Sequence, residues 1–177
     1  MKKKTLALVL ALTLLVAGVV GGTLAWLTDQ TAEVKNTFTV GDINIGLTET
    51  TADYKMVPGN TIAKDPTVTV KANSEACWLF VKVTESENLD TFITSAIAEG
   101  WTALPGVDGV YYREVPASAA DQTFSVLADN AVTVNSDVTK EMLTAKDFAN
   151  PTLTFQAYAV QKDNVASASD AWAKVTP

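Results

Sequence analysis

The chain has 177 residues with 20 acidic and 13 basic side chains, and its net charge of −7 argues against a nucleic-acid binder, which needs clustered lysine and arginine to neutralise phosphates. It has no histidine, so the commonest metal ligand and the usual acid–base group near neutral pH are both missing. One cysteine, Cys77, excludes an intrachain disulfide, and we interpret it as a small buried hydrophobic residue.

The first 25 residues have the pattern of a secretory signal peptide. Three lysines at positions 2–4 precede an apolar run over residues 6–20, which is shorter than the roughly 20 residues needed to span a bilayer. Thr23 and Ala25 are small enough for the −3 and −1 subsites of a signal peptidase, so cleavage is predicted after Ala25 and the mature chain begins at Trp26. The alternative is an uncleaved N-terminal anchor.

Cleavage at this position would leave a mature chain of 152 residues, enough for one domain with a sizeable core. It would remove three of the 13 basic residues and none of the 20 acidic ones, which changes the net charge from −7 to −10. The only arginine is Arg113, and no polybasic patch for a membrane surface is present. An exported domain without disulfides must be held together by its core, and it suits a bacterium without a strongly disulfide-forming periplasm.

The mature chain starts with a segment of weak periodicity and then a strand. Residues 26–36 favour neither a helix nor a strand. A strand is predicted over residues 37–45, and the apolar positions change parity at Gly41 and Asp42, which indicates a bulge there.

The next segments read as a turn, a strand and a second turn. Pro58 and Gly59 predict a turn at residues 57–60. Residues 68–71 alternate as a strand, and residues 72–75 form the following turn.

The middle of the chain contains its most apolar strand, over residues 77–83. Apolar residues occupy both parities, which predicts a central strand covered on both faces. Residues 88–99 then carry apolar side chains at helical spacing, which predicts an amphipathic helix with Asn88 as its N-cap and Gly100 as the residue after its end.

Two β-hairpins and a short helix are predicted next. The first hairpin joins residues 101–104 to residues 110–115. The second joins residues 123–127 to residues 131–134, and residues 139–148 form a short helix.

The last third of the domain ends with a long strand and a helix. Residues 152–161 alternate cleanly, which predicts a long central strand. Ser167 and Asp170 match the start of a helix that continues through Trp172. The whole pattern predicts a mainly β fold, an antiparallel β-sandwich or barrel with short helical insertions.

Several segments resemble one family of exported proteins. Residues 22–29 read Gly-Thr-Leu-Ala-Trp-Leu-Thr-Asp, and residues 36–43 read Asn-Thr-Phe-Thr-Val-Gly-Asp-Ile. With residues 63–70, residues 157–161 and the later Ala-Trp pair at 171–172, they resemble the TasA/camelysin family of biofilm-matrix proteins, which a SipW-type signal peptidase processes. The first 45 residues carry the specific part, and the chain is much shorter than TasA itself.

The resemblance implies a jelly-roll-like sandwich, preceded by a signal-peptide helix, that assembles into extracellular fibres. It divides the chain into a signal peptide at residues 1–25, an N-terminal donor segment at residues 26–36 and a sandwich domain at residues 37–177. In this family the donor segment leaves its own subunit and completes the sheet of the next. The residues expected to serve assembly here are Trp26, Leu27, Ala32, Val34 and Phe38.

The physical basis of such assembly is general. A sheet that lacks one strand exposes unpaired backbone groups, which an extended peptide with an apolar anchor satisfies by strand addition. Because tail and groove are different surfaces, the contact is head-to-tail and extends as a filament. The expected partners are therefore further copies of the chain, the SipW-type peptidase and related matrix proteins. The expected location is the matrix or cell surface of a Gram-positive-type bacterium.

The sequence also allows two alternatives to fibre assembly. Residues 26–36 can also be read as a frayed N-terminus. Trp101, Tyr111 and Tyr112 are aromatic residues of a predicted hairpin, and as a sugar-stacking platform they would make the chain a monomeric adhesin or carbohydrate-binding module.

An enzyme is not expected. Camelysin carries a metalloprotease label, but a His-Glu-x-x-His zinc site is impossible without histidine. No calcium-loop motif and no phosphate-binding glycine loop occur. The acidic residues Glu85, Glu87 and Asp90 are interpreted as a solvated surface near a helix start rather than a metal site. We therefore expect no cofactor.

The processing site gives a first test. N-terminal sequencing of the exported protein should begin at Trp26, and replacing Ala25 with a bulky residue should leave the precursor in the membrane, because the −1 subsite accepts only small side chains. Recovery of secreted protein that still carries residues 1–25 would contradict the assignment.

Overall fold

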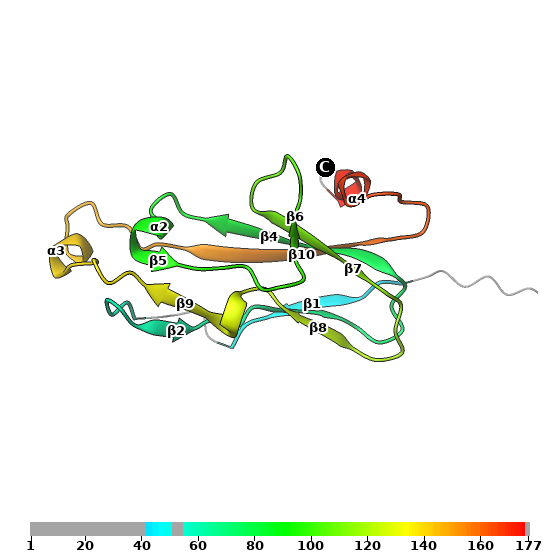
Figure 1. Ribbon diagram of the computed structural model, residues 1–177, viewed down its shortest axis with the longest axis horizontal. Coiled ribbons are helices and arrows are strands. Elements are labelled where there is room, and N and C mark those ends of the chain that lie inside the picture. Colours follow the sequence, from blue (N-terminus) through cyan, green and yellow to red (C-terminus); the bar gives the residue numbers. More distant parts are fainter. Residues whose placement is uncertain (1–41, 51–54, 176–177) are drawn as a thin grey trace, which may run out of the picture. The chain divides into compact units, whose positions relative to one another are not determined.

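The computed structural model describes residues 42–50 and 55–175, all within one compact unit, Val40–Pro177. These residues form a mainly β structure of antiparallel strands with a few short helices, as the sequence predicts (Figure 1). The predicted signal peptide at residues 1–25 and the predicted donor segment at residues 26–36 lie outside the described residues.

The described strands form three antiparallel sheets, ordered β10-β4-β7-β6, β1-β3-β8 and β2-β9-β5. In chain order, the strands are β1 (Ile45–Thr48), β2 (Thr61–Ala63), β3 (Thr67–Val70), β4 (Cys77–Glu85), β5 (Ile93–Thr94), β6 (Thr102–Ala103), β7 (Val110–Val115), β8 (Gln122–Ser125), β9 (Ala131–Val134) and β10 (Leu153–Gln161). The helices are α2 (Leu89–Phe92), the 3-10 turn η1 (Ala128–Asn130), α3 (Lys140–Leu143) and α4 (Ala168–Val175). Figure 1 shows β4, β7 and β10 in one layer and β1, β2, β8 and β9 in the other, with β5 drawn at the level of β10.

Strand β4 is central and covered on both faces, which confirms the prediction from its apolar sequence. Its residues 77–81 are all buried, and it pairs with β10 on one side and β7 on the other. Cys77, Leu79 and Val81 point into the space facing the β1-β3-β8 sheet, while Trp78 and Phe80 point to the opposite face. A strand buried on both sides needs a cover on each side, and the rest of the fold supplies two covers.

Three hydrophobic clusters result. The first, between the four-stranded sheet and the β1-β3-β8 sheet, has the buried members Val68, Val70, Cys77, Leu79, Val81, Val83, Val115 and Val126. The second lies under α4, where the Trp172 ring packs 5.2 Å from Phe80 and 5.3 Å from Tyr158, centroid to centroid. The third joins α2 to the β2-β9-β5 sheet and shares Leu153 and Phe155 of β10 with the first.

The second predicted hairpin is wrong. Strand β8 pairs with β3, whereas β9 pairs with β2 and β5, so the two strands belong to different sheets. Between them η1 places Asp129 and Asn130 at positive φ. The two pairings differ in register across this turn, because the three residues between Ala63 and Thr67 face the five residues between Ser125 and Ala131. The chain therefore bulges here and continues forward instead of folding back.

The predicted helix over residues 88–99 is also wrong in length. Helix α2 ends at Phe92, and Ile93 begins β5 opposite Val134. Side-chain capping is absent at Asn88, whose amide instead donates to the carbonyl of Ala149. β-Branched residues at positions 91, 93 and 94 favour an extended backbone, and cross-strand pairing with β9 gives that preference a partner.

The long strand near the C-terminus is confirmed as β10, but its predicted central position is wrong. It pairs with β4 alone among the described strands, so it lies at the edge of the four-stranded sheet. Alternating sequence shows that one face of a strand is buried, and it carries no information on whether both edges are paired.

Most remaining elements follow the sequence, but the helix predicted over residues 139–148 is shorter, since α3 ends at Leu143. The first hairpin forms between β6 and β7, Gly59 sits in its turn at φ +77°, and Thr139 caps α3 through its hydroxyl. Ser167 accepts a hydrogen bond from the backbone N–H of Asp170 at 3.1 Å and starts α4. Of the strand predicted over residues 37–45, only residues 42–45 are described, and strand pairing begins at Ile45.

The first hairpin offers a stability test with a matched control. Gly109→Ala should destabilise the fold by about 3 kcal/mol or more, because a Cβ there would lie 2.4 Å from the carbonyl oxygen of Val83 and the residue has φ +69°. Gly106→Ala in the same loop also adds a Cβ at positive φ, +76°, but into open space, and should cost only about 1–2 kcal/mol. Denaturant unfolding measures both. Equal losses would show that the close contact to β4 is unimportant.

Candidate assembly site

The residues predicted for processing and assembly, Thr23, Ala25, Trp26, Leu27, Ala32, Val34 and Phe38, all lie outside the described residues. The structure therefore brings none of them into a described site. What it describes is the surface that a strand from elsewhere would meet.

The outer edge of β10 carries unpaired backbone groups in the described part of the chain. The N–H of Lys162 donates to the carbonyl of Ala76, and the N–H of Ser86 donates to the carbonyl of Thr152. In an antiparallel pair the bonded residues alternate, so the even-numbered residues of β10 face β4. The N–H and C=O groups directed outward are those of Leu153, Phe155, Ala157, Ala159 and Gln161.

The same side of the molecule has an incompletely covered core. The side chains of Ile43 and Ile45 beside β10 are only half-buried, although they pack on the first cluster. Four side chains of β10 are also half-buried, namely Leu153, Phe155, Ala157 and Ala159. The side chain of Leu47 in β1 is 37% exposed. The edge of β10 thus combines unpaired backbone groups with an apolar row beneath it, which is what an incoming strand requires.

On the side away from β10, Arg113 of β7 packs against two aromatic rings. Its guanidinium carbon lies 4.0 Å from the ring centroid of Phe124 and 5.4 Å from that of Trp101. Trp101 is held in place by a 2.8 Å hydrogen bond from its Nε1–H to the carbonyl of Ser125. Burial lowers the pKa of Arg113, which still remains charged at neutral pH. Because β6 pairs with β7, the edge of the four-stranded sheet on this side is the two-residue strand β6.

A pocket of about 530 Å³ lies at the Leu153 end of β10. Its apolar lining comes from β2, from β9, from the α2–β5 region and from the segment that leads into β10. The lining residues include Glu49, Ile62, Lys64, Leu89, Val132 and Thr152.

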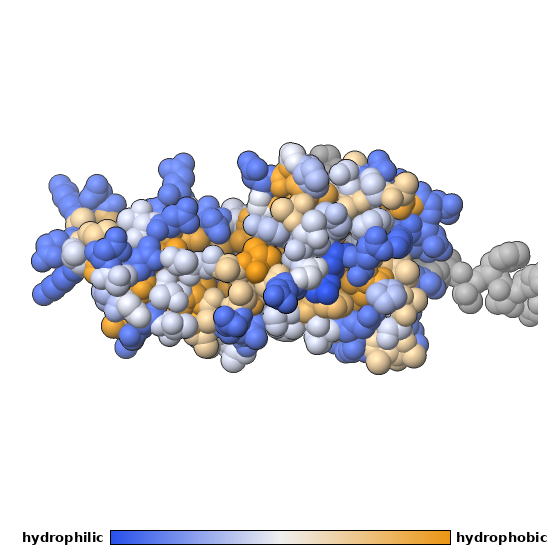
Figure 2. Space-filling view, viewed as in Figure 1, coloured by the Kyte–Doolittle hydropathy of each residue, from blue (hydrophilic) through white to orange (hydrophobic). Residues whose placement is uncertain are grey.

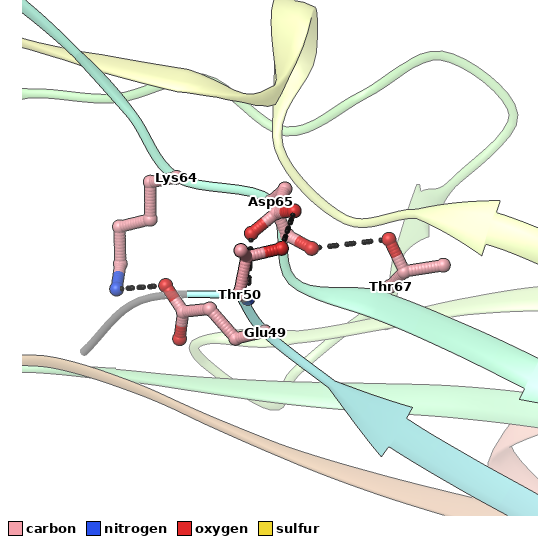
Figure 3. Close-up of polar contacts among 5 residues, drawn as sticks. All are labelled: Glu49, Thr50, Lys64, Asp65 and Thr67. Carbon is pink, nitrogen blue, oxygen red and sulfur yellow. Dashed lines mark hydrogen bonds and ion pairs between the residues drawn. The ribbon is translucent and has the colours of Figure 1, made fainter.

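Two polar contacts fasten the end of β1 beside this pocket (Figure 3). The Nζ of Lys64 lies 2.6 Å from a carboxylate oxygen of Glu49, with the Lys64 side chain only 9% exposed. The backbone N–H and the hydroxyl of Thr50 both donate to the carboxylate of Asp65, at 2.9 and 2.5 Å. Lys64 Nζ also lies 5.5 Å from the ring centroid of Phe155.

These contacts make Lys64 the polar centre of an otherwise apolar wall. A lysine that is almost fully buried must be paired, and its pairing with Glu49 supplies the partner. The pair ties the end of β1 to the link between β2 and β3, and Asp65 does the same one residue further on. The floor of the pocket is therefore fixed in place.

The aromatic residues considered for sugar binding do not form one surface. Tyr111 and Tyr112 are neighbours on β7 and point to opposite faces, Tyr111 toward the first cluster and Tyr112 toward Trp78 of the second. Trp101 stacks on Arg113 instead. No shared stacking platform exists among these three.

Other sites are also limited in the described chain. Residues 42–50 and 55–175 hold no group of three acidic, cysteine or histidine side chains placed to bind a metal ion. Cys77 has no exposed surface, and burial raises the pKa of its thiol to about 11, which confirms the interpretation as a buried hydrophobic residue. Within the described part, no helix is long and apolar enough to span a bilayer.

Comparison of the chain with protein-family models, with curated proteins and with solved structures found no significant match.

The contact of Thr50 with Asp65 can be tested by titration. The hydroxyl and N–H of Thr50 hold the pKa of Asp65 below its usual value of 3.8, so the stability from this carboxylate is present above that value and is lost as the pH falls through the folded-state pKa. Thr50→Val should raise the Asp65 pKa toward 3.8 in an NMR titration. Thr48→Val, at an exposed threonine two residues earlier, should leave the Asp65 pKa unchanged. An unshifted Asp65 pKa in Thr50→Val would contradict the assignment.

Proposed function

We propose that this chain is a secreted structural subunit of extracellular fibres, in a biofilm matrix or on a cell surface, and that it assembles by donating residues 26–36 to the next subunit. The fold is then a jelly-roll-like sandwich that lacks one strand. The signal-peptide pattern of residues 1–25 and the resemblance of residues 22–45 to TasA/camelysin proteins support export and processing by a SipW-type peptidase.

The observation that carries the proposal is the outer edge of β10. It is nine residues long, and its outward N–H and C=O groups have no partner strand among residues 42–50 and 55–175. Half-buried apolar side chains lie beneath it. An isolated edge of this length invites aggregation unless it is covered. The other edge of the same sheet is β6, which has only two residues and so offers far less backbone for strand addition.

The free energy of assembly should depend mainly on the two apolar anchor residues, Trp26 and Leu27. Each backbone hydrogen bond contributes only about 0.5–1.5 kcal/mol net, while ordering the segment costs about 1–2 kcal/mol per residue. Full burial of Trp26 and of Leu27 adds roughly 1.5–3 kcal/mol each. Backbone pairing gives register, and the two anchors determine whether assembly occurs.

The partners follow from this geometry. Segment and edge are different surfaces, so the contact is heterologous, and repetition gives a head-to-tail homopolymer to which related matrix proteins can add. The location is the extracellular matrix or surface of a Gram-positive-type bacterium. The chain acts without a cofactor and is not an enzyme.

Negative-stain microscopy of the purified mature chain tests the proposal. Trp26→Ala combined with Leu27→Ser should give folded monomers with an unchanged circular-dichroism spectrum and no filaments, because the anchors are lost. The matched control, Thr28→Ala with Gln30→Ser, changes the same segment and should still form filaments. A chain starting at Asn36 should stay monomeric, and a synthetic peptide of residues 26–36 should cap growing ends.

If the chain starting at Asn36 forms filaments of the same morphology, the donor segment is not required. A monomeric adhesin is the outcome if the complete mature chain forms no filaments under any condition.

A further inference from the structure

We propose that the pocket at the Leu153 end of β10 receives Trp26 and Leu27 of a second copy, so that the donated segment runs parallel to β10. This inference rests on the proposed function and specifies its acceptor. It adds a direction to the contact and a binding site for the new N-terminus.

The pocket suits two large apolar side chains. Its volume of about 530 Å³ lies within the range of about 300–1,000 Å³ that encloses small ligands. Ile62, Leu89 and Val132 supply apolar walls, and the pocket reaches the first residues of the unpaired edge, Leu153 and Thr154. An anchor placed here is therefore continuous with a strand added along β10.

The polar group at the pocket matches the chemistry that processing creates. Cleavage after Ala25 leaves a positively charged α-ammonium on Trp26, next to the indole that enters the pocket. Glu49 lies at the pocket with its side chain 23% exposed and pairs with Lys64, and its negative charge would attract this ammonium. The uncleaved precursor has a peptide bond at this position, so it lacks the charge that Glu49 would bind.

The direction follows from where the pocket and the start of the described chain lie. Glu75 donates its N–H to the carbonyl of Asp42, and the nearby Cys77 pairs with Gln161, so the described chain begins at the far end of β10 from the pocket. That strand is about 30 Å long at about 3.3 Å per residue. Residues 26–36 span up to about 36 Å when extended, enough to cover the edge from pocket to far end.

A second copy is taken as the occupant because the proposed function donates residues 26–36 to the next subunit. The extended length of this segment matches the length of the β10 edge. Filling of the pocket by the chain's own segment is a separate outcome of the cross-linking test below.

Disulfide mapping on the mature chain tests the direction. Thr28→Cys places a thiol beside the anchors but leaves Trp26 and Leu27 intact. In filaments, Thr28→Cys with Thr152→Cys should give an intermolecular ladder on non-reducing gels, since Thr152 is an exposed residue of the pocket lining. The matched pair, Thr28→Cys with Gln161→Cys, should give none, because Gln161 lies at the other end of β10.

The outcomes separate this inference from the proposed function. A ladder through Gln161 instead of Thr152 overturns the parallel direction and leaves strand donation standing. A fast-migrating monomer from the Thr152 pair shows that the chain's own segment fills the pocket, which also overturns the inference. Absence of filaments from the unmodified mature chain contradicts the proposed function itself.

A second measurement isolates the N-terminal charge. The peptide of residues 26–36 with a free amino terminus should cap filament growth about tenfold more potently than the same peptide with an acetylated terminus, because acetylation removes the ammonium. With subunits carrying Glu49→Gln, the two peptides should cap equally. Equal potency with unmodified subunits would overturn the role of Glu49.

Discussion

The fold depends on one constraint, which is that β4 is apolar on both faces. Leu79 and Val81 need a sheet on one side, and Phe80 needs a second cover on the other. The β1-β3-β8 sheet supplies the first and α4 supplies the second through Trp172. In Figure 2, hydrophobic residues appear as patches between the layers, and hydrophilic residues are dense around the α3 end. Strands β10 and β7 and helix α4 all pack directly against this strand.

Asymmetry between the two sides of the layers follows from the neighbours of β4. On the β7 side, the guanidinium of Arg113 packs against the rings of Trp101 and Phe124. On the β10 side, alanines at positions 157 and 159 leave the core thinly covered. Small side chains on an edge strand bury little surface of their own, so they leave room for side chains from outside.

The sequence predicts those elements whose signals are local. Strand β4, the hairpin at Gly106 and the capping of α4 by Ser167 were all recognisable from residue types at short spacing. The pairing partners of the strands could not be predicted in this way. The two strands flanking Asp129 have the local sequence of a hairpin, but they pair with the distant strands β2 and β3 and not with each other. For the same reason the edge position of β10 could not be predicted from its alternation.

The acceptor side of the candidate site was likewise hidden in the sequence. The contact of Lys64 with Glu49 joins residues that flank different strands, and neither side chain has a distinctive local pattern. Arg113 stands out in the sequence only because it is the single arginine of an acidic chain. Its contacts with Trp101 and Phe124 could not be predicted, because these residues lie in separate parts of the chain. Residues 26–36 were predicted from their own apolar start, and their contacts belong to the proposal.

The buried thiol of Cys77 has a consequence for the chemistry of the surroundings. Because it is fully covered and its pKa is raised to about 11, it is neither a thiolate at neutral pH nor within reach of another sulfur. With no second cysteine in the chain, folding has no oxidative step and no wrong pairing to correct. Reducing agents and mild oxidants should leave the domain equally stable, because its stability depends on packing and is independent of the surrounding redox potential.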